Sequence, residues 1–112
     1  MDLTVALAHV DGDRQLLAEL AAIFLRDYPR FVNSARESIR RDDAQTLERE
    51  AHTLKGRLAF FGVHGVRDQA LELETIGRSR DLTQALQTLT GIERAMEGVL
   101  VEFESLAREQ KS

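Results

Sequence analysis

The sequence predicts an all-α protein, folded as an antiparallel four-helix bundle with a short extra helix at the N-terminus. The 112 residues include one proline, one tyrosine, five phenylalanines and no tryptophan, so they offer little of what β-strands prefer. Strong helix formers such as leucine, alanine, glutamate and arginine are abundant, and apolar residues recur three and four positions apart. A chain of this length can bury one core, so we expect a single domain over residues 1–112.

Two helices are expected in the first part of the chain. A short one over residues 3–9 ends at the turn-forming residues 11–13, which read DGD. The second begins near Asp13, and its first apolar residues recur at helical spacing: Leu16, Leu17, Leu20, Ile23 and Phe24. The pattern continues beyond Pro29, so we expect one kinked helix that reaches about Arg41.

A third helix follows at once. Asp42 and Asp43 supply an N-cap for it, and its apolar pattern runs to about Phe61. Gly62 and Gly65 bracket a short break after it, because glycine is typical of the residue that follows a helix.

The fourth and fifth helices complete the predicted bundle. The fourth is expected over residues 66–77, ending at Gly77, and Asp81 is expected to cap a fifth over residues 82–108. The apolar stripe of the fifth helix consists of Leu82, Leu86, Leu89, Met96, Leu100 and Phe103. Short connections between helices of this length favour an antiparallel bundle.

Composition argues against several classes of function. With 15 Lys and Arg against 19 Asp and Glu, the net charge of −4 disfavours a general nucleic-acid binder. The chain has no cysteine, no glycine-rich phosphate loop and no run of 18 apolar residues, so thiolate chemistry, a nucleotide site and membrane insertion are not expected. The N-terminus lacks the features of a secretory signal, so we expect a cytoplasmic protein.

The third helix presents a histidine on its outer face. Drawn at about 100° per residue, its core-facing stripe falls within about 40° of one direction. That stripe consists of Leu47, Ala51, Leu54, Leu58 and Phe61. His52 points about 140° away from it. The residues that share the outward face with His52 are Gln45, Glu48, Gly56 and Ala59, and they are candidate partner-binding residues.

Gly56 is out of place in a helix on grounds of stability alone, since glycine costs roughly 0.5 to 1 kcal/mol relative to alanine there. It stands one turn after His52, where a side chain would crowd an approaching partner. Lys55 lies about 60° round the helix from His52 and can bring an ammonium to an anion on the ring. An unencumbered neutral imidazole beside a lysine suits phosphoryl transfer.

These residues resemble the central motif of the histidine-containing phosphotransfer (HPt) domains of multistep bacterial phosphorelays. That motif reads approximately H-x-L-K-G-small-small-x-x-apolar-G, and residues 52–62 read HTLKGRLAFFG. The likeness extends to residues 12–29, GDRQLLAELAAIFLRDYP, and to Leu73-Glu74 downstream. The sequence departs from the family at Arg57 and Leu58, where small residues are usual, and at Gln69, where an apolar residue is usual.

The resemblance implies a phosphorelay function. His52 would accept a phosphoryl group from a receiver-domain aspartate and pass it to another receiver, Lys55 would lie near the phosphate, and Gly56 would leave room. Glu74 would stand where a polar group orients the imidazole. The implied partners are receiver domains of response regulators and of a hybrid sensor histidine kinase. The receiver would supply Mg²⁺, and the chain itself would hold no cofactor and act as a monomer.

Several assignments stay open at this point. Phe60 either packs under the N-terminal helix or joins a partner-binding patch, and Glu74 is either an orienting group or a solvated glutamate. His9 and His64 are expected on the surface, and a metal site shared by His52 and His64 fails because twelve helical residues rise about 18 Å.

Two other functions fit the same residues. The bundle could dock a receiver or another helix without covalent chemistry. It could also be the phosphoacceptor domain of a larger histidine kinase whose ATP-binding domain lies elsewhere in the same chain. Phosphate that is labile in acid and stable in base, after exposure to a phosphorylated receiver, would exclude the first alternative.

Overall fold

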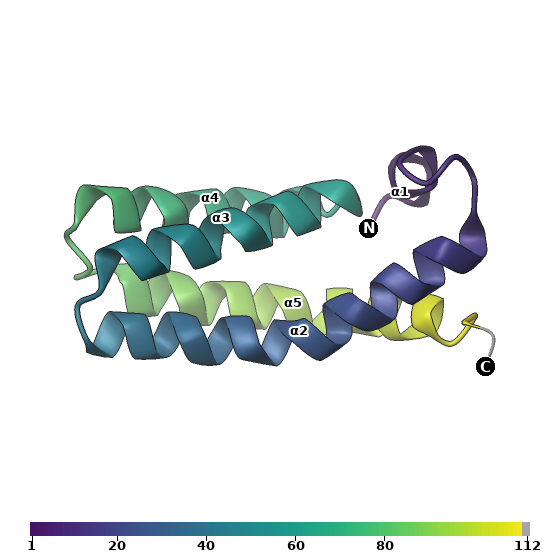
Figure 1. Ribbon diagram of the computed structural model, residues 1–112. Coiled ribbons are helices and arrows are strands. Elements are labelled where there is room, and N and C mark those ends of the chain that lie inside the picture. Colours follow the sequence, from purple (N-terminus) through teal and green to yellow (C-terminus); the bar gives the residue numbers. More distant parts are fainter. Residues whose placement is uncertain (111–112) are drawn as a thin grey trace.

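A computed structural model describes residues 1–110, which fold into five α-helices and contain no β-strand (Figure 1). The helices are α1 Leu3–Ala8, α2 Arg14–Arg40, α3 Ala44–Phe60, α4 His64–Ser79 and α5 Ala85–Ala107. In Figure 1, α3 and α4 lie side by side above α2 and α5, and α1 covers one end of the bundle. The molecule measures 43 × 23 × 21 Å along its principal axes. The predicted fold class, a four-helix bundle with an extra N-terminal helix, is confirmed.

The short helix α1 is attached to the end of α3. Asp2 caps α1 by accepting hydrogen bonds from the backbone N–H groups of Thr4 and Val5, and its own backbone N–H donates to the carbonyl of Phe61 at 3.1 Å. Gly62 adopts a φ of +69°, and a Cβ there would lie 2.6 Å from the Cβ of Asp2. Glycine therefore serves both the backbone conformation and the close approach of α1.

The helix α2 is continuous through Pro29, as predicted, and bends in Figure 1 between its two halves. Asp13 caps it by accepting from the N–H of Leu16. Two members of its predicted stripe are not core residues, since Leu16 is 39% exposed and Ile23 is 41% exposed. The apolar arc of α2 is wider than the surface that the other helices cover, which leaves these two side chains at its edge.

The core runs along the middle of the bundle. Its largest fully buried side chains are Leu17, Leu47, Leu58, Leu73, Leu89, Ile92, Met96 and Phe103. The rings of Phe24 and Phe103 stack with centroids 4.2 Å apart and join α2 to α5. The whole predicted core stripe of α3 is buried, and this fixes which face of α3 meets solvent.

The predicted end of α4 is wrong. The helix begins at His64, so Gly65 lies in its first turn, and it continues past Gly77 to a left-handed Arg80 with φ +67°. Gly77 is buried within the helix, and a Cβ there would lie 2.8 Å from the backbone nitrogen of Glu48. This glycine serves the close packing of α3 on α4 and does not end the helix.

The predicted start of α5 is also wrong. Asp81 accepts hydrogen bonds from the backbone N–H and the hydroxyl of Thr83, which is a local turn, and α5 begins three residues later than expected. In the predicted α5 stripe Leu86 is 51% exposed, because α5 starts at the edge of the bundle there. Within residues 1–110, no helix has the length and hydropathy needed to cross a bilayer.

Candidate functional site

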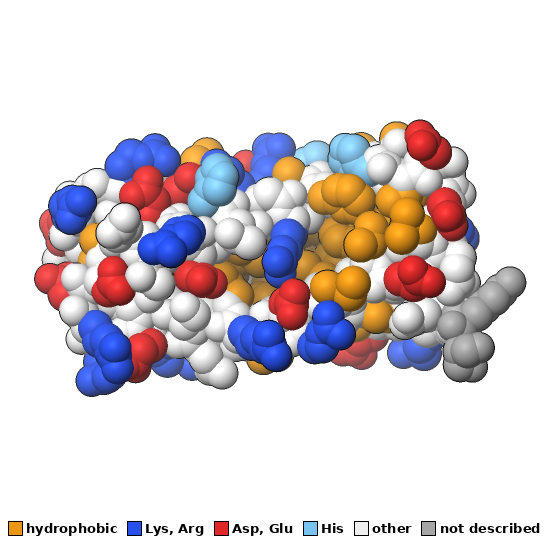
Figure 2. Space-filling model, viewed as in Figure 1, with side chains coloured by type: hydrophobic (Ala, Val, Ile, Leu, Met, Phe, Trp, Pro, Cys, Tyr) orange, Lys and Arg blue, Asp and Glu red, His pale blue; other side chains and the backbone are white. Residues whose placement is uncertain are grey.

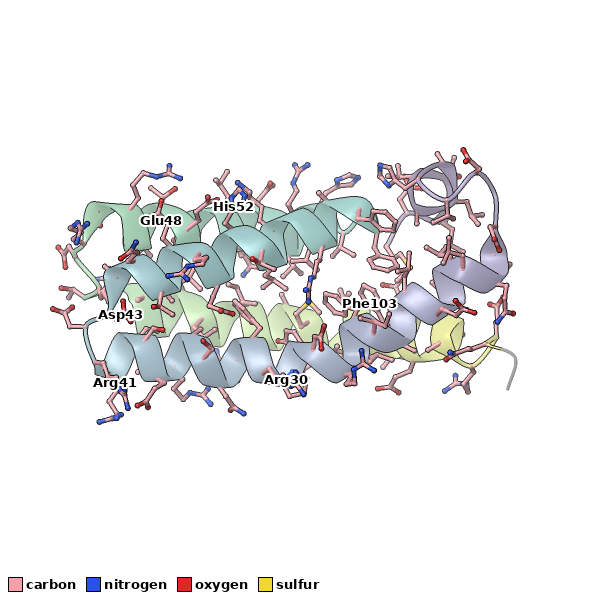
Figure 3. The ribbon with its side chains drawn as sticks, in the orientation of Figure 1. Arg30, Arg41, Asp43, Glu48, His52 and Phe103 are labelled. Carbon is pink, nitrogen blue, oxygen red and sulfur yellow. The ribbon has the colours of Figure 1, made fainter. Side chains whose placement is uncertain are left out.

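The side chain of His52 projects into solvent from the middle of α3 (Figure 3). It is 67% exposed, as the helical wheel predicted, because the opposite face of α3 carries the buried stripe. The packing of that stripe holds the backbone beneath the imidazole in place. The ring is therefore open to another molecule while its base stays fixed.

A buried carboxylate from the neighbouring helix contacts the ring. Glu74 of α4 is only 4% exposed, and its Oε2 lies 2.8 Å from Nδ1 of His52. Its Oε1 accepts a hydrogen bond from Nζ of Lys55 at 2.6 Å, and Oε2 also accepts from Nη2 of Arg78 at 3.2 Å. One carboxylate thus joins three nitrogen-bearing side chains from two helices.

The charge of Glu74 follows from these contacts. Burial alone would raise its pKa, but the hydrogen bonds from Lys55 and His52, together with their charges, lower the pKa below its usual value. An ionised carboxylate only accepts hydrogen bonds, so Nδ1 of His52 carries the proton and donates it to Glu74. When the ring is neutral, its lone pair is then on Nε2, and within residues 1–110 no side chain or backbone group forms a hydrogen bond to that nitrogen.

Lys55 and Arg78 hold Glu74 from two sides. Lys55 is 27% exposed, and in this structure its ammonium binds Glu74 instead of standing free beside the ring. Arg78 was missed by sequence reasoning, although its position four residues after Glu74 on the same helix could have indicated the contact. Nε of Arg78 also donates to Oε2 of Glu48 at 3.1 Å, so the network returns to α3.

Only some of the residues predicted to share the outward face with His52 are exposed. Gln45 and Gly56 are exposed, whereas Glu48 and Ala59 are half-buried. Apart from its chain neighbours and the adjacent backbone of α3, a Cβ added at Gly56 would meet no atom within 4 Å, so the space over that part of α3 is open. On the other side of the ring a shallow hollow is lined by Gln45, Glu48, Arg49, His52, Glu74 and Arg78.

A larger, mainly apolar hollow of about 550 Å³ lies between His52 and α2. Figure 2 shows apolar side chains gathered on this face, over the region where α1, α2 and the end of α3 meet. The lining residues are Leu20, Ile23, Phe24, His52, Thr53, Gly56, Arg57, Phe60 and Phe61. An exposed apolar surface of this kind is typical of a protein-binding site.

Phe60 both packs against the end of the N-terminal helix and lies on the candidate partner-binding surface, the two alternatives that the sequence left open. It stacks on His9 at the end of α1 with ring centroids 4.8 Å apart, and it also lines the apolar hollow. Nδ1 of His9 lies 2.9 Å from the carbonyl oxygen of Phe60. His9 and His64 are both exposed, as predicted. Within residues 1–110, no three histidine, aspartate or glutamate side chains converge as metal ligands would.

The arrangement is a helical bundle with an exposed histidine whose Nδ1 contacts a buried carboxylate on the neighbouring helix. A family model described as Hpt domain matches residues 19–108, and the chain belongs to this family. Its function is therefore histidine phosphotransfer in a two-component phosphorelay. The resemblance drawn from the motif at residues 52–62 is confirmed.

A solved structure has the same fold. The chain is similar to the crystal structure of histidine-containing phosphotransfer protein B (HptB) from Pseudomonas aeruginosa PAO1, with a TM-score of 0.88 and 22% sequence identity. The alignment covers 99% of this chain and 96% of that one. At this identity the likeness establishes the fold alone. No curated protein sequence matches the chain significantly.

Proposed function

We propose that Nε2 of His52 accepts a phosphoryl group from the aspartyl phosphate of one receiver domain and passes it to an aspartate of another. The observation that carries this proposal is the contact between Nδ1 of His52 and the buried carboxylate of Glu74 at 2.8 Å. An ionised Glu74 can only accept a hydrogen bond, so this contact supports a proton on Nδ1 and a lone pair on Nε2. The roles proposed for Glu74, Lys55 and Gly56 follow from this assignment.

The transfer step needs no base. The Nε2 lone pair forms the N–P bond while the P–O bond to the receiver aspartate breaks, and the electron pair leaves with the aspartate carboxylate. The proton on Nδ1 stays where it is, so the ring gains a positive charge as the bond forms. The carboxylate of Glu74 stabilises that charge across the hydrogen bond, and it does so again when the reaction runs in reverse.

Lys55 acts on the phosphoryl group through its position. Its Nζ and Nδ1 of His52 bind the two oxygens of one carboxylate, so the ammonium lies close to the ring. From there its charge attracts a phosphoryl group that approaches the imidazole. Gly56 leaves the approach open, because no atom beyond the adjacent stretch of α3 lies within 4 Å of where its Cβ would be.

The partners are receiver domains of response regulators and of a hybrid sensor histidine kinase, which dock on the apolar hollow beside His52. Mg²⁺ held by the receiver neutralises the phosphoryl oxygens, and the chain contributes no cofactor of its own. We place this relay in the cytoplasm. The chain acts as a monomer, since His52, Lys55 and Glu74 of one copy complete the site, and sedimentation velocity tests this.

The test is transfer from a purified receiver domain that has been charged with acetyl phosphate. The parent chain should gain phosphate that is labile in acid and stable in base, and His52→Gln should gain none. His64→Gln, which changes another exposed histidine, is the matched control and should be labelled like the parent. If His52→Gln still gains phosphate, His52 is not the acceptor. If a receiver binds the parent but transfers no phosphate to it, the function is docking without covalent chemistry.

A further inference from the structure

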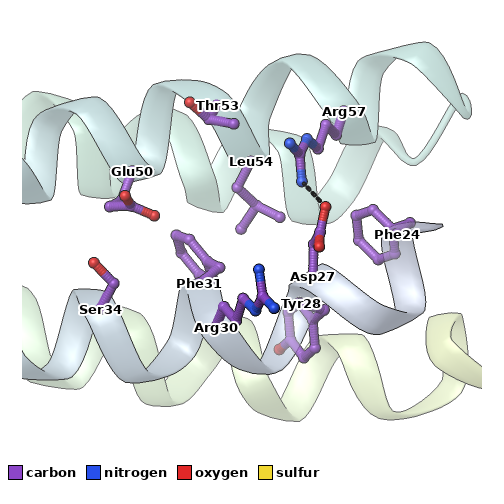
Figure 4. Close-up of a pocket in the computed structure, with 10 residues that line it drawn as sticks. All are labelled: Phe24, Asp27, Tyr28, Arg30, Phe31, Ser34, Glu50, Thr53, Leu54 and Arg57. Carbon is purple, nitrogen blue, oxygen red and sulfur yellow. Dashed lines mark hydrogen bonds and ion pairs between the residues drawn. The ribbon is translucent and has the colours of Figure 1, made fainter.

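A single arginine lies between two hollows in the groove that separates α2 from α3. One is the apolar hollow beside His52, and the other is a hollow of about 300 Å³ further along the groove (Figure 4). The side chain of Arg57 lines both of them and is 48% exposed. Among residues 1–110, it is the one lysine or arginine that lines the apolar hollow, and no aspartate or glutamate of that range lines it.

Arg57 has one weak partner within its own chain. Its Nη1 lies 3.3 Å from Oδ2 of Asp27, as the dashed line in Figure 4 shows, and Asp27 is 25% exposed. Within residues 1–110 this is the only side-chain hydrogen bond or ion pair that joins α2 to α3. Exposed pairs of this kind are worth little, so Arg57 can exchange Asp27 for another carboxylate at small cost.

Docking of a partner makes the hydrogen bonds of Arg57 more important for stability of the complex. A protein that covers the apolar hollow removes water from around the guanidinium, which then needs more hydrogen-bond acceptors than Oδ2 of Asp27 provides. A carboxylate on the partner can meet the planar guanidinium with two parallel hydrogen bonds. A partner that brings a lysine, an arginine or an apolar group to the same point leaves a desolvated charge unpaired.

We propose that Arg57 is a specificity-determining residue, which selects receiver domains that bring a carboxylate to the mouth of the α2–α3 groove. This inference rests on the proposed function, because it assumes that a receiver docks over the hollow beside His52. It assigns Arg57 to partner choice and not to chemistry, since the ion pair with Asp27 directs the guanidinium toward α2.

The test compares two variants that break the same ion pair. The probe is the receiver domain, among those encoded in the same genome, that transfers fastest to the parent after charging with acetyl phosphate. Arg57→Ala should raise the half-saturating receiver concentration about fivefold, and Arg57→Glu about tenfold or more, with the maximal rate unchanged. Asp27→Asn frees Arg57 for the receiver, so it should lower the half-saturating concentration or leave it as in the parent.

A structural role for the ion pair predicts a different pattern. If the pair only holds α2 against α3, then Arg57→Ala and Asp27→Asn weaken transfer equally and lower the unfolding free energy equally, which would overturn the proposal. Half-saturation within twofold of the parent for Arg57→Glu would overturn it as well. A charge reversal on the receiver, from its acidic residue to arginine, should restore tight docking of Arg57→Glu.

Failure of the proposed function looks different from either result. In that case no receiver transfers phosphate to the parent, and both proposals fall together. If a receiver transfers phosphate to the parent and to the Arg57 variants equally well, only the proposed specificity role of Arg57 is contradicted. Circular dichroism and chemical denaturation of each variant establish that the fold is intact before rates are compared.

Discussion

Oε2 of Glu74 lies 2.8 Å from Nδ1 of His52, and the two residues are 22 positions apart on neighbouring helices. The carboxylate is buried while the imidazole is exposed, so the hydrogen bond reaches from the interior of the bundle to its reactive surface. We propose that Glu74 sets both the tautomer and the orientation of the ring.

Replacing this carboxylate by its neutral isostere should slow transfer without unfolding the protein. Glu74→Gln retains a hydrogen-bond acceptor for Nδ1 but loses the charge that stabilises the phosphorylated ring. We expect the maximal transfer rate from a receiver to fall about tenfold, with half-saturation little changed. Rapid-quench measurement of phosphate on His52 checks this. An unchanged rate would show that Glu74 positions the ring and that its charge plays no part.

The same carboxylate should make stability depend on pH. The pKa of Glu74 is lower in the folded protein than in the unfolded chain, so its contribution to stability is present above the unfolded pKa of about 4.3. That contribution is lost as the pH falls through the lowered folded pKa. The unfolding free energies of the parent and of Glu74→Gln should therefore differ most near neutral pH and converge below about pH 4. Urea denaturation at neutral and acidic pH tests this, and an equal difference at both would contradict it.

Substitutions at Gly56 should separate stability from function. Gly56→Ala places a methyl group in open space and restores helix propensity, so the unfolding free energy should rise by roughly 0.5 to 1 kcal/mol. Gly56→Gln should keep most of that gain yet slow receiver-dependent transfer steeply, because its side chain lies one turn from the imidazole. Denaturation and transfer are measured on all three forms. Fast transfer by the Gln form, or a less stable Ala form, would contradict this role for the glycine.

Replacing Gly77 by alanine should lower the unfolding free energy, whereas the same replacement at Gly56 should raise it. A Cβ there would lie 2.8 Å from the backbone nitrogen of Glu48 and 2.9 Å from its Cα, and backbone cannot move aside cheaply. We expect Gly77→Ala to lower the unfolding free energy by about 1 to 3 kcal/mol. Gly56→Ala is the matched control, since both glycines are helical and only one is buried. A stabilised Gly77→Ala variant would mean that α3 and α4 separate without loss.

Tyr28 offers a direct probe of the core, because it is the one tyrosine in the chain. Burial, with a contribution from the charge of Glu93, raises its pKa to about 12. Tyrosinate absorbance of the folded protein should therefore appear well above the unfolded value of about 10. The stability linked to this shift is present below pH 10 and is lost as the pH rises toward about 12. Circular dichroism at each pH separates ionisation from unfolding, and titration of the folded state near 10 would contradict the prediction.

Much of the site could be predicted because helical periodicity is a local property. The spacing of Leu47, Leu54 and Leu58 fixes the buried face of α3, and the exposure of His52 follows from it. The boundaries of α4 and α5 were predicted less well, since Gly77 and Asp81 have the chemistry of helix ends but serve packing and a turn instead. Propensity is a weak signal where tertiary contacts compete with it.

The sequence by itself determined the helical class, the outward direction of His52 and the open space at Gly56, because all three depend on positions within a few residues of one another. Only the tertiary structure decided that Lys55 binds Glu74, that Arg78 joins them and that Arg57 reaches across the groove to Asp27. These contacts depend on how one helix is rotated and shifted against the next. That register is set by packing in the core, such as the approach of Gly77 to Glu48, which no single helix encodes.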